Sequence, residues 1–197
     1  MKREKLQESK ISLRALKNST KSTMFKIPIN KRKHKLGNID FKGWSIELYK
    51  TDDSKVLLPY INVYFSVESK ESKTGKRVKY MQIIQLPYRQ EYREKSFQSF
   101  YEETPIKIFS SDPSFQYFLA YALNKVNAVV INRETSKHLG VALTKKPKTR
   151  NPVLHKELNK HMYKLIEFIS SKKLNRYINE KTYLGMNKMP TSPDLEI

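Results

Sequence analysis

A chain of 197 residues, 38% of them hydrophobic, is long enough for one folded domain with additional tails. It contains no cysteine, which excludes disulfides, thiolate metal ligands and a cysteine nucleophile. Its 39 Lys and Arg against 19 Asp and Glu give a net charge of +20. The excess of lysine fits two explanations, sequence-blind contact with phosphate or acidic protein and the codon usage of an AT-rich genome. No apolar run predicts a membrane helix, and the charged start, MKREKLQESK, does not read as a signal peptide.

Residues 1–39 are predicted to form a basic, extended N-terminal arm. This segment holds 12 Lys and Arg and only 2 Asp and Glu. Leu13 and Leu16 belong to a weak helical stripe within it. A solvated tail and an arm that orders on nucleic acid or on a neighbouring subunit both fit this composition. Its densest charge run supplies four predicted polyanion or partner contacts: Lys31, Arg32, Lys33 and Lys35.

Alternating apolar and polar residues predict three antiparallel strands between residues 40 and 87. The first alternation lies around Trp44, the second covers residues 61–67 and the third covers residues 78–83. The polar stretch SKESKTGK suits a hairpin loop between the last two strands. Residues 88–103 remain open between a short helix and an extended arm.

A fourth short strand, residues 104–109, is predicted to lead directly into a helix. Asp112 is a good N-cap, and Pro113 suits the first helical position because its missing N–H would be unpaired there anyway. Apolar residues then follow at helical spacing: Phe115, Phe118, Leu119, Ala122, Leu123 and Val126.

A basic connector, residues 144–152, separates this helix from the last clear helix, which is predicted to begin near Pro152. The apolar stripe of that second helix comprises Leu154, Leu158, His161 and Leu165. The connector contributes four more predicted polyanion or partner contacts: Lys145, Lys146, Lys148 and Arg150.

Together these patterns predict an α+β fold, in which a small antiparallel sheet of three to five strands packs with two main helices. We expect one α+β domain at residues 40–182, flanked by the basic extended arm, residues 1–39, and by a C-terminal tail, residues 183–197. No internal repeats are present.

Motifs that would carry catalysis are scarce. The five glycines are too scattered for a phosphate loop, and neither a serine elbow nor a His-Glu-x-x-His motif occurs. Glu68 and Lys70 imitate the Glu-x-Lys of metal-dependent nucleases, but no acidic partner precedes them convincingly, so we interpret them as charges at a hairpin end. His155 and His161 are six residues apart and cannot chelate from one helix face. We therefore expect no catalytic residues, no cofactor and no enzymatic activity.

The turn and the two helices resemble a SWIM-type zinc finger, whose layout is a strand, a Cys-x-Cys-Pro turn, an aromatic helix and a later helix opening with Cys-x-His. Small virion proteins of tailed phages are similar, with a phenylalanine after the proline and a Lys-x-Arg-Asn-Pro-like segment before the second helix. Here IFSSDPSFQYFLAY matches the turn and the aromatic helix, KPKTRNP precedes the second helix, and Asn159-Lys160-His161 stands in place of Cys-Lys-His. The resemblance covers residues 106–169.

The resemblance implies that four positions correspond to zinc ligands: Ser110, Asp112, Asn159 and His161. Only His161 retains a ligand residue of the family, and the other three could not hold zinc as thiolates do. The resemblance therefore implies a metal-free descendant, in which packing offsets the folding free energy that the metal would supply. Ser110 and Asp112 then become helix caps, and Asn159 and His161 become hydrogen-bonding partners.

The function implied is that of a non-enzymatic structural component of a tailed-bacteriophage virion, made in the cytoplasm of the bacterial host. Such a protein would act by protein–protein assembly within a large multi-subunit particle, with its basic arms contacting other virion proteins or packaged DNA, and with no membrane partner. The alternative is a free nucleic-acid-binding protein without sequence specificity. This would explain the charge, although the sequence contains no known motif for recognising bases.

Overall fold

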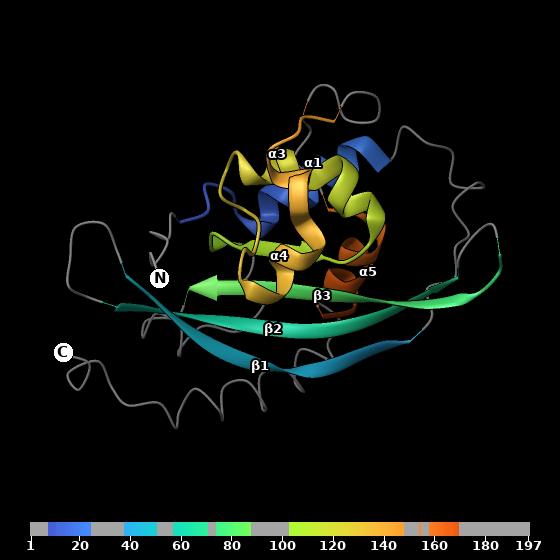
Figure 1. Cartoon of the computed structure of the whole chain (residues 1–197), viewed down its shortest axis with the longest axis horizontal. Coiled ribbons are helices and arrows are strands. Elements are labelled where there is room, and N and C mark those ends of the chain that lie inside the picture. Colours follow the sequence, from blue (N-terminus) through green and yellow to red (C-terminus); the bar gives the residue numbers. More distant parts are fainter. Residues whose placement is uncertain are drawn as a thin grey trace.

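The computed structural model describes residues 8–24, 38–50, 57–70, 74–87, 103–147, 154 and 158–169. Figure 1 draws the whole chain and leaves the other residues as a thin trace. The tail, residues 183–197, lies outside the described residues. So do six of the predicted polyanion contacts: Lys31, Arg32, Lys33, Lys35, Lys148 and Arg150.

Four strands form one antiparallel sheet in the order β1-β2-β3-β4. They are β1 (Ile39–Lys50), β2 (Leu57–Lys70), β3 (Arg77–Pro87) and β4 (Lys107–Ser110). Val63 in β2 pairs with Ile84 in β3, so the alternating apolar residues of these two strands share one face. This arrangement confirms the expected α+β class and its small antiparallel sheet.

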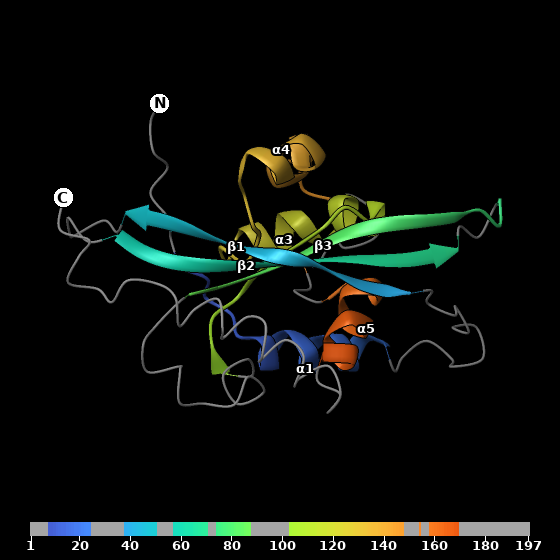
Figure 2. The same ribbon diagram turned by 90° about the horizontal axis from the view of Figure 1, so that it is seen from below.

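Helices cover both faces of this sheet. Figure 2 shows α1 (Leu13–Met24) and α5 (Lys160–Ile169) on one side, and α3 (Ala120–Asn124) and α4 (Arg133–Leu139) on the other. Two short helical segments complete the described structure, the π-helical η3 (Phe115–Leu119) and the 3₁₀ segment η4 (Gly140–Leu143). Because helices pack on both sides, every residue of β3 from Gln82 to Pro87 is buried. None of the helices in the described part of the chain is both long and apolar enough to cross a membrane.

Helix α1 lies within the segment that was expected to be an extended arm. Leu13 and Leu16 are 1% and 0% exposed and belong to the core. The Oγ1 of Thr20, one turn later, accepts a hydrogen bond of 2.8 Å from the backbone N–H of Leu158. The weak leucine stripe is therefore a buried helix face, and residues 8–24 pack with the folded domain instead of forming part of an arm.

The transition from β4 into the aromatic helix follows the predicted capping. The Oδ1 of Asp112 accepts a hydrogen bond of 2.7 Å from the N–H of Ser114, and the carbonyl of Asp112 accepts one of 3.0 Å from the N–H of Phe115. Phe115 is fully buried and packs edge-on against Phe109 of β4, with 6.0 Å between the ring centroids. The cap and this aromatic contact together fix the direction in which the chain leaves the sheet.

We predict that Leu16→Ala lowers the free energy of unfolding by about 2–5 kcal/mol, because it leaves a cavity where α1 meets the core. Chemical denaturation of the full chain measures this change. Asn18→Ala, an exposed position of the same helix, is the matched control and should change stability by less than about 0.5 kcal/mol. Equal stability of the two variants would show that α1 does not pack as described.

Candidate functional site

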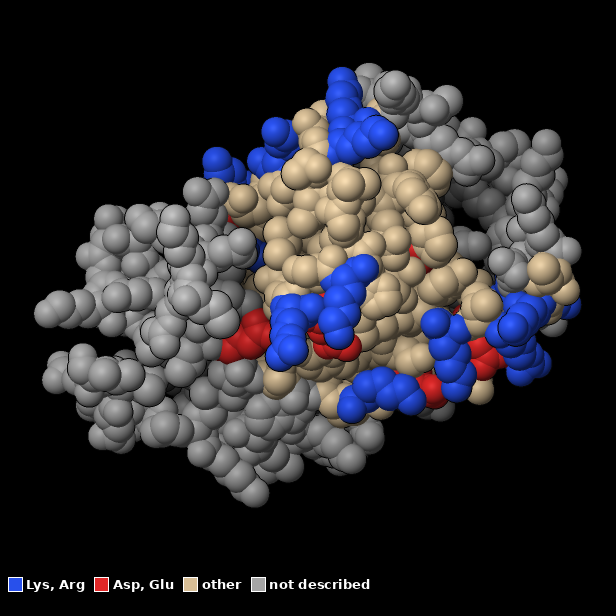
Figure 3. Space-filling view, viewed as in Figure 1, with Lys and Arg blue, Asp and Glu red and all other residues tan. Residues whose placement is uncertain are grey.

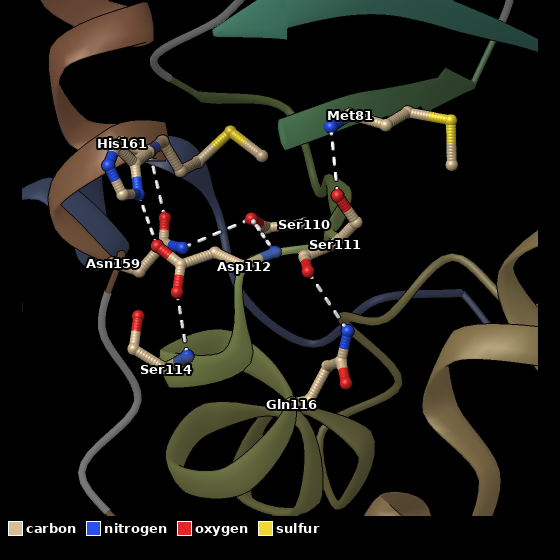
Figure 4. Close-up of polar contacts among 9 residues, drawn as sticks. Met81, Ser110, Ser111, Asp112, Ser114, Gln116, Asn159 and His161 are labelled. Atoms are coloured by element: carbon tan, nitrogen blue, oxygen red, sulfur yellow. Dashed lines mark hydrogen bonds and ion pairs between the residues drawn. The ribbon is translucent and has the colours of Figure 1, made fainter. Parts of the chain in front are cut away.

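The four positions singled out by the sequence meet in one buried cluster between the end of β4 and the start of α5 (Figure 4). The Nδ2 of Asn159 donates a hydrogen bond of 3.1 Å to the Oγ of Ser110. The Nδ1 of His161 is bonded to the Oδ2 of Asp112. Each bond joins residues 49 positions apart in the chain. We call these four residues the polar cluster.

Three members of the polar cluster also accept hydrogen bonds from backbone N–H groups two or three residues later. The Oγ of Ser110 accepts a hydrogen bond of 3.1 Å from the N–H of Asp112. The carboxylate of Asp112 accepts a hydrogen bond from the N–H of Ser114, as described above. Asn159 is the N-cap of α5, and its Oδ1 accepts a hydrogen bond of 2.8 Å from the N–H of Met162. The cluster therefore joins two capped ends, one of a turn and one of a helix.

The cluster is shielded from solvent. Its side chains belong to residues that are 0–5% exposed, and the ring of Tyr80 covers His161 at 5.0 Å between centroids. Burial raises the pKa of the Asp112 carboxyl, but the hydrogen bond and charge of His161 and the N–H of Ser114 outweigh it and leave this pKa below its usual value. An ionised carboxylate only accepts hydrogen bonds, so His161 must donate from Nδ1.

Two buried groups beside the cluster have no hydrogen-bond partner within the described part of the chain. They are the Nε2 of His161 and the side-chain amide of Gln82, whose residue pairs with Ser110 across β3 and β4. Sequence reasoning missed Gln82, because its place beside the cluster follows from the strand register. Unpaired buried polar groups of this kind are the usual partners of an internal water, which typically makes about three hydrogen bonds.

The geometry does not build a nucleophile and base pair. The hydroxyl of Ser110 is bonded to Asn159 and to the backbone of Asp112, and not to His161. A serine nucleophile needs its base within hydrogen-bonding distance, which this arrangement lacks. The polar atoms of the cluster instead form fixed contacts between elements.

The residues present also do not fit zinc. The carboxylate and amide oxygens of Asp112 and Asn159 accept hydrogen bonds from N–H groups, and the hydroxyl of Ser110 is neutral. Zinc prefers thiolate, imidazole and carboxylate ligands in a tetrahedral set, of which this cluster supplies too few. No group of three or more His, Cys, Asp or Glu in the described residues could hold a metal ion.

Ser111 lies between two members of the cluster but bonds to β3 instead of α5. Its N–H donates a hydrogen bond to the carbonyl of Met81, and its Oγ accepts one from the N–H of Met81, both at 2.9 Å. The side chain of Gln116 donates to the carbonyl of Ser111 at 3.0 Å. Figure 4 shows the bond to the Ser111 hydroxyl and the bond from Gln116 next to those of the cluster. The turn is therefore held from β3, from α5 and from its own helix.

The predicted polyanion contacts that the structure describes lie elsewhere. Lys145 and Lys146 are exposed on the segment that follows η4, where they line a surface groove. The structure therefore separates the sequence-predicted residues into a buried polar cluster and an exposed basic segment.

We predict that Asp112→Asn lowers the free energy of unfolding at pH 7 by about 1–3 kcal/mol, because it removes a buried, charge-assisted hydrogen bond. The pKa of Asp112 is lowered in the folded chain, so its contribution is present above the ordinary value of 3.8 and is lost as the pH falls through the folded value. The difference between the wild type and the variant should therefore shrink in acid, as denaturation at several pH values measures.

Asp40→Asn is the matched control, since Asp40 is a partly exposed carboxylate of β1 that lies 3.7 Å from the Nζ of Lys42. Its loss should cost less than about 1 kcal/mol. An Asp112→Asn variant as stable as this control at pH 7 would contradict the role assigned to the polar cluster.

Comparison of this chain with protein-family models, with curated proteins and with solved structures found no match.

Proposed function

We propose that this protein is a non-enzymatic structural component of a tailed-bacteriophage virion, and that its polar cluster replaces the zinc of a SWIM-like ancestor. The observation that carries the proposal is the convergence of Ser110 and Asp112 with Asn159 and His161. These positions match the ligand positions of the family. The members of each bonded pair lie 49 residues apart in the chain. Their contact is what an inherited scaffold without its metal would retain.

The chemistry of the cluster supports a structural role over a catalytic one. Its members are buried, bonded to one another and engaged in capping, so they hold the turn after β4 against the start of α5. A catalytic group must reach a substrate in a cleft, whereas these residues are 0–5% exposed. In this proposal the cluster stabilises the domain, and assembly depends on the surface and on the basic segments.

The charge of the chain supports partners that are anionic. A net charge of +20 is concentrated partly in the segment around Lys31 to Lys35 and in the connector from Lys145 to Arg150. In a particle, other virion proteins and packaged DNA offer the carboxylates and phosphates that such segments bind. The site of action that follows is the virion, and the protein would bind there as one subunit of a large assembly.

We predict that the chain is present in purified virions at a fixed copy number, because a structural subunit occupies defined positions in a closed assembly. Quantitative mass spectrometry of particles purified through two different density steps measures this number. A host cytoplasmic protein of similar charge is the control for adventitious adsorption. If the chain is lost between purification steps together with that control, the virion role is wrong.

A second prediction tests the descent of the polar cluster. The triple variant Ser110→Cys, Asp112→Cys and Asn159→Cys, which keeps His161, should bind about one Co²⁺ or Zn²⁺ per chain, because it restores the Cys₃His donor set of a structural site. Thiolate-to-cobalt absorption and elemental analysis measure the binding. Because metal and folding are coupled in such sites, the variant is refolded with and without metal.

The matched control moves one cysteine by a single residue, with Ser111→Cys in place of Ser110→Cys. Ser111 hydrogen-bonds to Met81 on β3 and does not contact Asn159, so this variant should bind metal much more weakly. Equal binding by the two triple variants, or none by either after refolding with metal, would contradict the proposed descent.

A further inference from the structure

An open groove of about 690 Å³ lies on the side of the molecule that carries α3 and α4, away from the polar cluster. Its walls come from η3, from the end of α4, from η4 and from the segment that follows η4. The side chain of Asn124 in α3 donates to the carbonyl of Leu143 at 3.3 Å and holds these walls together. The lining residues that matter here are Tyr117, His138, Val141, Lys145 and Lys146.

The groove contains the two large hydrophobic residues that are most exposed in the described structure. Tyr117 is 69% exposed and Val141 is 73% exposed. Tyr117 lies in the π-helical segment η3, in which Phe115 and Leu119 point into the core. Short π-helical segments are frequent at functional sites. An aromatic ring on the outer side of a helix whose other side is anchored in the core offers its face for stacking.

The walls of the groove are basic. Lys145 and Lys146 are exposed, and neither forms an ion pair with any residue that the structure describes. Residues 115–147 contain one carboxylate, Glu134, and five basic residues, of which Lys145 and Lys146 line the groove. In Figure 3 the large red patches lie at the level of the sheet, and the upper part of the described surface is tan bordered by blue.

We propose that this groove binds single-stranded nucleic acid, with a base stacked on Tyr117 and the adjoining phosphates on Lys145 and Lys146. Exposed aromatic rings beside a basic track are how proteins bind single strands without sequence preference. A duplex keeps its bases paired and could not offer one to the ring of Tyr117. Lysine, as a point charge, suits phosphate contacts that read no sequence.

The groove favours a nucleotide strand over an acidic peptide for a specific reason. A carboxylate-rich peptide would bind the two lysines but would gain little from the flat face of Tyr117, whereas every base has a π-face that stacks on it. This site lies apart from the polar cluster, so the inference does not depend on the proposed virion role. A variant of the groove that lost nucleic-acid binding but still entered particles would separate the two.

The test is fluorescence anisotropy of the full chain with labelled oligonucleotides at low and moderate salt. The probes are a 12-nucleotide single-stranded DNA, an RNA of the same sequence and the corresponding DNA duplex. We expect Tyr117→Ala to weaken single-strand binding about 5- to 150-fold. Tyr117→Phe, which keeps the ring, should bind like the wild type. The double variant Lys145→Ala and Lys146→Ala should make the slope of log affinity against log salt less steep by about 1.4.

The matched control is the double variant Lys125→Ala and Lys137→Ala, which removes the same charge from the same body but does not line the groove. Its binding should exceed that of the groove variant. Preference for DNA or for RNA would identify the natural strand and support the site in either case. The proposed site would be wrong if Tyr117→Ala bound the single strand as tightly as the wild type, or if the two lysine variants lost affinity equally. Displacement of the strand by poly-glutamate at an equal concentration of charge would also contradict it.

Discussion

The bond between Asp112 and His161 is the constraint on which this domain depends most. It lies inside the molecule, where residues 5% and 2% exposed give their side chains little water to bond with. A carboxylate in such a place is costly unless it is paired and hydrogen-bonded. Asp112 is both, through His161 and Ser114. The pairing therefore fixes the distance and the angle between the turn after β4 and the first turn of α5.

Other contacts extend this constraint to the rest of the layer on that face of the sheet. The hydroxyl of Thr20 in α1 accepts a hydrogen bond from the N–H of Leu158, the residue that precedes the N-cap of α5. The start of α5 is thus held from the N-terminal helix and from the strand turn at once. Three segments that are distant in the sequence meet at this point, which explains why a helix in a strongly basic region packs with the core. The sequence of that region is dominated by basic residues, which predicted an arm. The burial of Leu13 and Leu16 instead places α1 in the core.

Local patterns predicted what depends on local chemistry. The strands followed from alternation, and the cap at Asp112 followed from an N-cap residue before proline. The convergence of Ser110 with Asn159 was expected only from the resemblance to a family, since nothing in a spacing of 49 residues requires contact. Gln82 and Ser111 could not be found beforehand, because their places depend on the register of β3 and β4. Tyr117 was missed for another reason: helical spacing left it off the buried apolar stripe, and spacing alone does not show that an exposed ring lines a groove.

The same short turn consequently serves two surfaces of the molecule. Its buried side carries Asp112, bonded across to α5, and five residues later Tyr117 lies in the outer groove. The rigidity of the buried side benefits the outer one, because a ring whose backbone is fixed loses less conformational entropy when a ligand binds. Hydrogen bonds can supply this rigidity without a metal ion. The strength of this link depends on the protonation of one carboxylate, because the pKa of Asp112 is lowered by its partners in the folded chain.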